Sequence, residues 1–325
     1  MEVEWAEVQC LKSLRWLYAI DENWVVTWFK FGKCRVPHAG IGWDAVVRRG
    51  WARLLACFAL VWLCPYGITQ GFWNGFHGGN AEMRKVQPTW VTPLVGTTPL
   101  LGQFLREEFV RQRMPDGNSV WNIGSGKGLS LLAGNRVETD LSVPNYAVHG
   151  AEAGTDGVGD FCFTARVRML SGNPEHGNYA LTAVLSQTWS TGLAKNGADT
   201  WTRGITLSGG KAFGRFAVLS SLGATIPASK GLAAMGRPIG WNSAAEMHVV
   251  PRVWAQLESN TTFYKGGAHD GITQHYVTPG LFLAPLRPWS AKSKSFILLG
   301  AGMQFATTHY HASDHNLVID TKIYF

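Results

Sequence analysis

The last ten residues of the chain, 316–325, constrain its fold more than any other stretch. Successive side chains of an extended strand point to opposite faces. The face that ends on an aromatic residue carries Leu317, Ile319, Thr321, Ile323 and Phe325. The other face carries the charged residues Asp320 and Lys322. We therefore predict a terminal strand with lipid on one side and water on the other.

This ending is similar to the C-terminal strand by which bacterial outer-membrane barrels are recognised and closed, which makes the barrel assembly machinery an expected partner. An edge strand of a soluble sheet that ends in Phe is the alternative. The same alternation recurs upstream, and residues 160–170 show it best. There Phe161 and Phe163 share one face, whereas Arg166 and Arg168 share the other and require water on that side.

Segments with a period of two follow one another along the rest of the chain, with little helix signal. Residues 101–113 suit a short helix or a first strand, and we interpret them as a strand. The further strands are predicted at 119–132, 136–143, 160–170, 179–189, 201–213, 215–226, 239–250, 253–264, 273–284, 295–310 and 316–325. These make about twelve, and single-chain bacterial barrels have an even number.

The connections between the predicted strands alternate in length. Short ones at 133–135, 214 and 251–252 are interleaved with long ones at 144–159, 190–200, 227–238 and 265–272. Three others, 171–178, 285–294 and 311–315, do not follow this alternation. Short turns on one side and long loops on the other are typical of outer-membrane barrels. We predict an all-β fold, a closed antiparallel up-and-down transmembrane β-barrel; a soluble all-β domain is the alternative.

The composition fits a surface that faces lipid. Only 16% of the residues are charged, against about 25% in an average soluble domain, while Gly (38) and Trp (15) are plentiful. The net charge of +7 comes from scattered residues, without a Lys/Arg run or a zinc spacing, so we expect no nucleic-acid partner. Gly124-Ser-Gly-Lys-Gly128 lacks the upstream glycine and the Ser or Thr of a phosphate loop. We expect no cofactor.

The region before the barrel divides into three parts. Residues 46–71 combine Arg48, Arg49 and Arg53 with an apolar stretch too short to span a membrane, as in a signal peptide; a buried core helix is the alternative. Residues 1–45 are interpreted as an upstream extension from a mis-assigned start. Residues 72–100 are rich in Gly, Pro and Thr, and we expect no stable element in this lead-in. The barrel is predicted to occupy 101–325.

Charged residues on the inferred inward faces are the candidate functional residues. They are Arg136, Glu138, Asp140, Arg166, Arg168, Glu246, His248 and Glu258. Opposed charges in a lumen either brace the wall as a salt-bridge network or set which solutes pass. Both interpretations stay open.

A second cluster lies at the last hairpin, where His309, His311 and His315 gather near Asp314. His309 and His311 would share a strand face, so a weak surface metal site is one hypothesis, and exposed polar loop residues are the other. The spacing of His311 and Ser313 also resembles the His-x-Ser dyad of outer-membrane phospholipases, without a surrounding motif.

Several short motifs resemble a family of bacterial outer-membrane barrels labelled transporter or "putative MetA-pathway of phenol degradation". They are Val91-Thr-Pro-Leu-Val95, Asn122-Ile-Gly-Ser-Gly-Lys-Gly128, Val143-Pro144, Asp156-Gly-Val-Gly-Asp160 and Gly236-Arg-Pro-Ile-Gly-Trp-Asn242. The resemblance runs from about residue 90 to Phe325. It implies a barrel in the outer membrane and passage of aromatic or other hydrophobic compounds, and it carries no catalytic residues.

We therefore expect a cell outer-membrane channel or transporter for small hydrophobic or aromatic solutes, without enzymatic activity. A non-conducting structural or binding barrel is one alternative. An outer-membrane lipid hydrolase that uses His311 and Ser313 is the other.

Overall fold

The computed structural model describes residues 79–124, 126, 128–150, 154–192, 196–287 and 295–325. The predicted upstream extension (1–45), the signal peptide (46–71) and the first part of the lead-in (72–78) lie outside the described residues. Within the described ranges, helices are all too short or too polar to cross a membrane.

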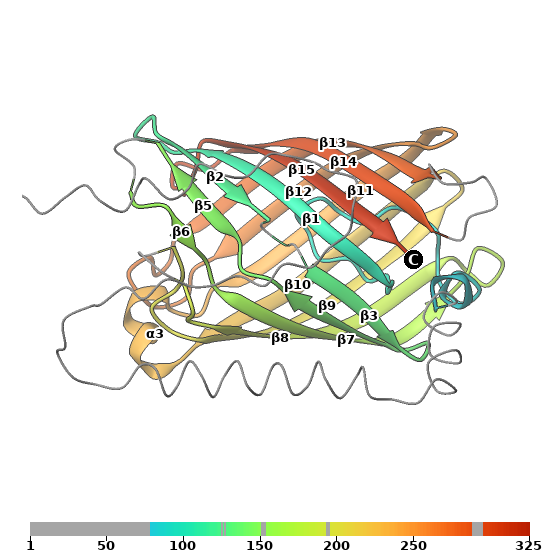
Figure 1. Ribbon diagram of the computed structural model, residues 1–325, viewed down its shortest axis with the longest axis horizontal. Helices are drawn as coiled ribbons and strands as arrows, with labels where there is room; N and C mark the ends of the chain where they lie inside the picture. Colours follow the sequence, from blue (N-terminus) through green and yellow to red (C-terminus); the bar gives the residue numbers. More distant parts are fainter. Residues whose placement is uncertain (1–78, 125, 127, 151–153, 193–195, 288–294) are drawn as a thin grey trace, which may run out of the picture. The chain divides into compact units, whose positions relative to one another are not determined.

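The strands form one antiparallel sheet that closes on itself, because the last strand, β15, pairs with the first, β1 (Figure 1). In chain order the strands are β1 (Phe104–Arg113), β2 (Ser119–Ile123), β3 (Gly128–Ala133), β4 (Val137–Ser142), β5 (Tyr146–His149), β6 (Gly157–Val158), β7 (Phe161–Gly172), β8 (Tyr179–Trp189), β9 (Thr202–Phe213), β10 (Phe216–Pro227), β11 (Ile239–Val250), β12 (Val253–Phe263), β13 (Thr273–Leu286), β14 (Phe296–Ala306) and β15 (His315–Tyr324).

Three of the wall strands are interrupted. The first consists of β2 and β3, which both pair with β1. The second consists of β4, which pairs with β3, and β5, which pairs with β2. The third consists of β7, which pairs with β4, and β6, which pairs with β5. Counting each interrupted strand once, the described residues form a closed barrel of twelve strands, which confirms the predicted fold class.

The interruption between β2 and β3 is the glycine-rich motif Gly124–Gly128. Gly124 and Gly126 have φ angles of 74° and 77°, a left-handed conformation that glycine adopts without a steric cost. Four residues separate Ile123 from Gly128, whereas two separate their partners Phe109 and Arg106 on β1, so the wall strand has a bulge at this point. The sequence predicted one continuous strand over 119–132, because the alternation of side chains resumes after the bulge, and that prediction was wrong at this point. The predicted loop 144–159 likewise contains β5 and β6.

The two ends of the barrel differ in their connections. At one end, here called the turn end, lie the short turns 134–136, 214–215 and 251–252 and the chain terminus Phe325. At the opposite loop end, residues 228–238 contain the short helix α3 (Ser229–Met235), and residues 307–314 form a loop. The predicted strand 295–310 therefore stops at Ala306, and the last loop is longer than its sequence suggested.

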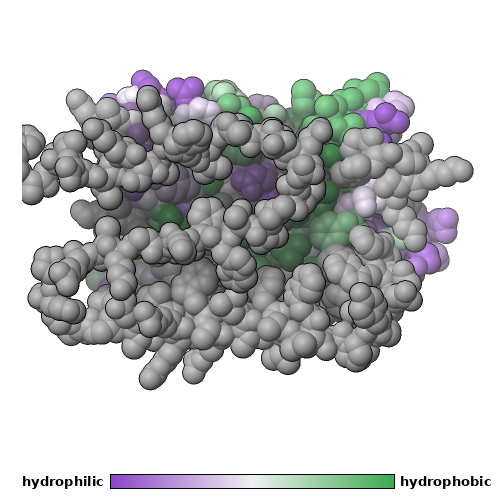
Figure 2. Space-filling view, viewed as in Figure 1, coloured by the Kyte–Doolittle hydropathy of each residue, from purple (hydrophilic) through white to green (hydrophobic). Residues whose placement is uncertain are grey.

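Apolar side chains face outward along the wall. Exposed ones occur on successive strands, among them Leu185, Leu207, Leu222, Leu257, Leu281 and Ile319. Where the surface is uncovered in Figure 2, a group of hydrophobic residues lies along the upper side of the barrel, and hydrophilic residues lie at the right-hand end. The inward face carries buried polar residues instead, including Glu138, Thr182, Ser208, Glu258 and Asp320. The barrel is thus apolar outside and polar inside.

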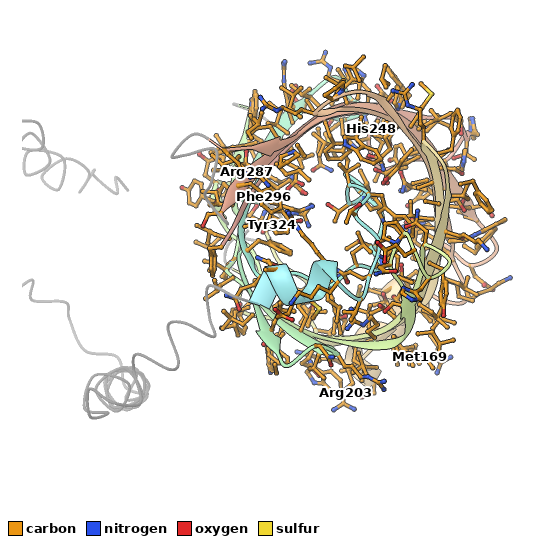
Figure 3. All side chains as sticks on the ribbon, turned by 90° about the vertical axis from the view of Figure 1, so that its right-hand side faces the viewer. Met169, Arg203, His248, Arg287, Phe296 and Tyr324 are labelled. Carbon is orange, nitrogen blue, oxygen red and sulfur yellow. The ribbon has the colours of Figure 1, made fainter. Side chains whose placement is uncertain are left out.

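The lead-in does not lie free, contrary to the expectation that it forms no stable element. Residues 79–84 are helical, and the following segment enters the ring of strands before β1 begins (Figures 1 and 3). Val91, Leu94, Leu100 and Leu101 are all less than 10% exposed. The segment is ordered because its backbone and apolar side chains find partners on the inner wall.

Candidate functional site: a loop that occupies the lumen

The candidate site is the part of the lumen occupied by residues 88–100, which we call the plug loop. Its two ends meet at one point, where the side-chain amide of Gln87 donates to the carbonyl of Leu101 at 2.6 Å and its oxygen accepts from the Leu101 N–H at 3.0 Å. The plug loop therefore begins and ends at this hydrogen-bonded pair of residues, Gln87 and Leu101, which we call its closed base.

Asn80 fastens this base to the wall. Its side chain accepts from the N–H of Gln103 at 2.7 Å and donates to the main-chain oxygens of Gln103 and Phe325, at 2.6 and 2.7 Å. One amide thus joins the helical segment, the start of β1 and the last residue of the chain.

Glu258 of β12 holds the innermost part of the plug loop. Its carboxylate accepts hydrogen bonds from three consecutive backbone N–H groups, those of Leu94, Val95 and Gly96, at 2.6, 3.1 and 2.7 Å. Gln256 and Asn260 add side-chain donors at 3.0 and 3.4 Å. Because Glu258 is 1% exposed, these donors replace its hydration shell. The carboxylate acts as a receptor for backbone groups that have no partner within the loop.

Other wall residues bind the plug loop in sequence around the lumen. Ser208 donates to the carbonyl of Thr97 at 2.7 Å and Thr182 to that of Pro99 at 2.6 Å. Across the lumen, Lys322 donates to the hydroxyl of Thr92 at 2.5 Å. The contacts come from β8, β9, β12 and β15, so the loop crosses the lumen and contacts more than one side of the wall.

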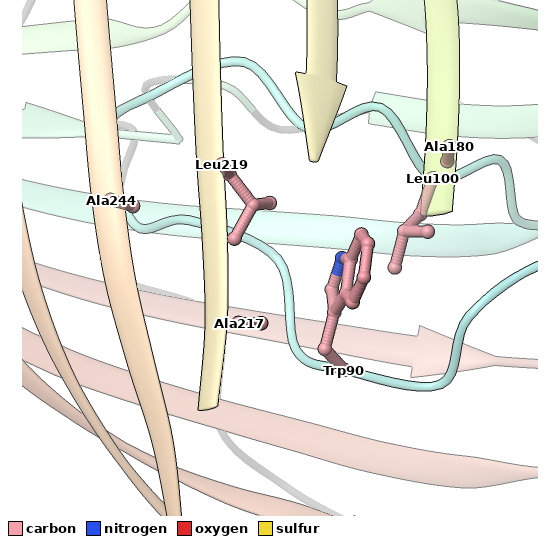
Figure 4. Close-up of a cluster of buried hydrophobic side chains, with 6 residues drawn as sticks. All are labelled: Trp90, Leu100, Ala180, Ala217, Leu219 and Ala244. Carbon is pink, nitrogen blue, oxygen red and sulfur yellow. The ribbon is translucent and has the colours of Figure 1, made fainter. Parts of the chain in front are cut away.

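Apolar contacts seat the loop as well. Trp90 and Leu100 pack with Ala180, Ala217, Leu219 and Ala244 from the wall strands (Figure 4). Leu94 packs in a second cluster with Phe282, Leu298 and Val318. A Cβ atom at Gly280 would lie 2.5 Å from a Leu94 methyl group, so the bare backbone of β13 makes room for this side chain.

A cluster of charged residues on β4 and β7 contacts the end of the plug loop. Arg166 lies 3.2 Å from Glu138 and 2.9 Å from Asp140, and donates to the carbonyl of Thr98 at 3.2 Å. Glu138 accepts from the Gly102 N–H at 2.5 Å. The network braces the wall and holds the loop at the same time.

A second charged group crosses the seam that closes the barrel. Arg106 of β1 pairs with Asp320 of β15 at 2.8 Å and with Glu108 of its own strand. Lys322 lies 2.9 Å from the other oxygen of Asp320, an ion pair without hydrogen-bond geometry. Asp320 is fully buried and Lys322 is 3% exposed.

The structure places most of the predicted lumen residues on the inner wall. Glu138, Asp140, Arg166, Glu246, His248 and Glu258 project from their strands as predicted, and Arg168 contacts Met83 and Gln87 beneath the plug loop at 3.4 Å each. Arg136 does not line the lumen: it is exposed in the turn before β4, because that strand begins only at Val137. A role of these residues in selectivity stays a prediction.

Glu246 differs from its neighbours. It is 1% exposed, and neither carboxylate oxygen has a hydrogen-bond partner among the described residues. It lies opposite Ala217 and Gln256 on the flanking strands.

Sequence reasoning missed Asn80, Gln87, Arg106 and the apolar residues of the plug loop. Asp320 and Lys322 carried a signal, since both alternate on the water-facing side of the last strand. Asn80 and Gln87 carried none, because their partners lie far away in sequence.

The terminal residues follow the predicted faces. Ile319 is 39% exposed on the outside, whereas Val318, Asp320 and Lys322 are buried inside. Leu317, Thr321, Ile323 and Phe325 alternate with these inward residues. Their role as an assembly signal stays a prediction.

The histidine cluster is not arranged as the sequence suggested. His309 and His311 lie in the loop 307–314 and share no strand face, and His315 begins β15. His311 contacts the carbonyl of Thr308 and the carboxylate of Asp314, whereas the buried Ser313 hydroxyl lies 3.3 Å from Tyr276 Oη. Among the described residues, no hydrogen bond joins His311 to Ser313, and no group of three or more His, Cys, Asp or Glu could hold a metal ion.

We expect the loop 307–314 to loosen as the pH rises. Hydrogen bonds to the Thr308 carbonyl, at 2.8 Å, and to Asp314, at 2.9 Å, raise the pKa of His311 above its usual value. Both bonds need ring N–H groups, so the stabilisation is complete below about pH 6.5 and is lost as the pH rises through the folded-state pKa. Hydrogen exchange of the loop amides across this range checks the prediction. Asp314→Asn should shift the transition to lower pH, and an unshifted transition would contradict it.

Comparisons with known proteins complete this description. No protein-family model and no curated protein matches the chain. Among solved structures, the outer membrane channel DcaP of Acinetobacter baumannii matches 69% of this chain and 96% of its own, with 10% identity and a TM-score of 0.33. An anion-selective porin from Comamonas acidovorans matches 68% and 97%, with 9% identity and a TM-score of 0.32. Because these scores are low, the function is inferred below from this chain's own residues.

Proposed function

We propose that the protein is an outer-membrane conduit for small solutes, and that its own plug loop controls passage. The observation that carries this proposal is the set of three hydrogen bonds that the Glu258 carboxylate accepts from the backbone N–H groups of residues 94–96, in the middle of a polar lumen. Hydrogen bonds between a wall carboxylate and loop backbone can be exchanged for water when the loop leaves.

The outer surface supports the membrane placement. Apolar side chains on successive strands would be exposed to water in a soluble protein, and hydrocarbon is the environment that suits them. In this arrangement the turn end faces the periplasm and the loop end faces the exterior. The solutes proposed are small hydrophobic or aromatic compounds, as the family resemblance implies, and the barrel assembly machinery is the proposed partner in insertion.

Replacing residues 88–100 by a short glycine-serine linker should open the lumen. The closed base at Gln87 and Leu101 makes this replacement possible without straining the wall, because the two ends of the loop already meet. We expect the shortened protein to give large, stable steps of current in a planar bilayer, whereas the full-length protein gives rare or small ones. Single-channel recording measures the difference.

The control is a linker of the same composition in place of the exposed loop 265–271, at the opposite end of the barrel, which should leave the current of the full-length protein unchanged. If the shortened barrel is folded by circular dichroism and heat modifiability but passes no ions, the conduit proposal is wrong. The protein would then be a non-conducting barrel.

A further inference from the structure

A cavity of about 460 Å³ lies at the turn end, between the base of the plug loop and the wall. Its lining includes the turn Pro251–Arg252, Ala284 and Tyr324, which lie near the ends of their strands. This volume falls in the range of small-molecule sites. The cavity therefore has room for a solute on the proposed periplasmic side of the plug loop.

Two stacked aromatic pairs form part of the cavity lining. His248 and Trp254 stack with ring centroids 4.5 Å apart, and Phe296 and Tyr324 stack at 4.4 Å with nearly parallel planes. The first pair comes from β11 and β12 and the second from β14 and β15, so they lie at different positions around the ring in Figure 3. Trp90 and Phe104 add further apolar surface. The lining suits an apolar body.

The charged side chains among the described lining residues of the cavity are of one sign. Arg84 and Arg252 line it, and none of the described lining residues is acidic. The guanidinium of Arg84 lies 4.5 Å from the ring centroid of Phe296. Burial and the nearby charge of Arg287 lower the pKa of Arg84. An anion at this position would offset the repulsion between Arg84 and Arg287.

Arg252 has an unusual backbone conformation for a residue with a side chain. Its φ is 71°, in the left-handed region that Gly and Asn adopt more easily. The two-residue turn that joins β11 to β12 places this cation at the edge of the aromatic cavity.

We propose that this cavity binds an amphiphilic monoanion, whose apolar body packs against the aromatic residues and whose carboxylate or similar head group pairs with Arg84 and Arg252. This site rests on the conduit function proposed above. It specifies the solute further, as an apolar compound with an anionic head group. Binding would place the solute directly below the plug loop, in contact with Trp90 and Thr92.

Equilibrium dialysis of the refolded protein in amphipol against octanoate and 1-octanol tests this site. The two probes share an apolar body and differ in the charged head. We expect octanoate to bind about tenfold more tightly than 1-octanol, as charge-assisted hydrogen bonds to arginine would give. Arg84→Met and Arg252→Met should each reduce octanoate binding towards that of 1-octanol and leave 1-octanol binding unchanged.

Arg203→Met is the matched control, because Arg203 lies at the loop end and packs on Trp201; it should change neither affinity. Equal binding of the two probes by the parent, or unchanged binding of octanoate in both cavity variants, overturns the proposal. If Arg84→Met also loses 1-octanol, Arg84→Lys decides: a retained preference for octanoate supports the site, and a lost preference overturns it.

The assay does not depend on passage. If the barrel binds octanoate but never conducts, the proposed binding site is supported and the conduit proposal is wrong. A conducting barrel without a preference for octanoate would refute the site and keep the conduit.

Discussion

Substituting Glu258 with alanine is expected to release the plug loop and raise the ratio of open to closed barrels roughly hundredfold or more. The carboxylate bonds three backbone N–H groups of residues 94–96, and each hydrogen bond to a charged group contributes about 1.5–3 kcal/mol. Alanine would leave those N–H groups buried without a partner, so the loop would be more stable in water. Single-channel recording measures the fraction of time spent open.

Glu175→Ala is the matched control, since Glu175 is exposed in the turn between β7 and β8 and touches neither the plug loop nor the seam. Glu258→Gln, which keeps the volume but not the charge, should give an intermediate opening. A folded Glu258→Ala barrel that is open no more often than the parent would show that the carboxylate does not hold the loop.

The second large effect is expected at the seam between β1 and β15. Asp320→Ala removes a carboxylate that contacts both Arg106 and Lys322, and Lys322 would lose the ion pair that offsets the burial of its charge. Breaking a buried pair from one side costs about 3–5 kcal/mol. We expect the free energy of unfolding to fall by about that amount. Urea unfolding in lipid vesicles, followed by tryptophan fluorescence, measures it.

Thr321→Ala changes the adjacent residue, which faces outward, and serves as the control with an expected effect below about 0.5 kcal/mol. Unfolding of Asp320→Ala and Thr321→Ala at the same urea concentration would contradict the role assigned to the seam network.

The wall of the barrel was predictable because its signal is local. A strand that faces lipid on one side and water on the other alternates residue by residue, and the alternation alone placed Arg166 next to Glu138 and Asp140 and put Asp320 and Lys322 inside. The bulge at Gly124–Gly128 was missed for the same reason: alternation resumes beyond it. Strand ends were less reliable, as Arg136 and the loop 307–314 show.

The plug loop could not be predicted in this way. Its residues have no period, and the groups that order it lie far along the chain: Leu94 bonds to Glu258, 164 residues away. A sequence rich in Gly, Pro and Thr is typical of an unstructured segment unless a partner surface is already formed. Glu258 was predicted to line the lumen, but nothing in its neighbourhood indicated that its ligand is the chain's own backbone.

The hydrogen bonds of Asn80 have a consequence for the order in which parts of the protein fold. The plug segment precedes every strand in the sequence, yet Asn80 also bonds the main-chain oxygen of Phe325, which directly follows the last strand, β15. Its hydrogen bonds are complete only when the segment before β1 has met the end of β15. Loop seating and seam formation are therefore late and mutually dependent steps, so a protein that is truncated at its carboxyl terminus would lose both at once.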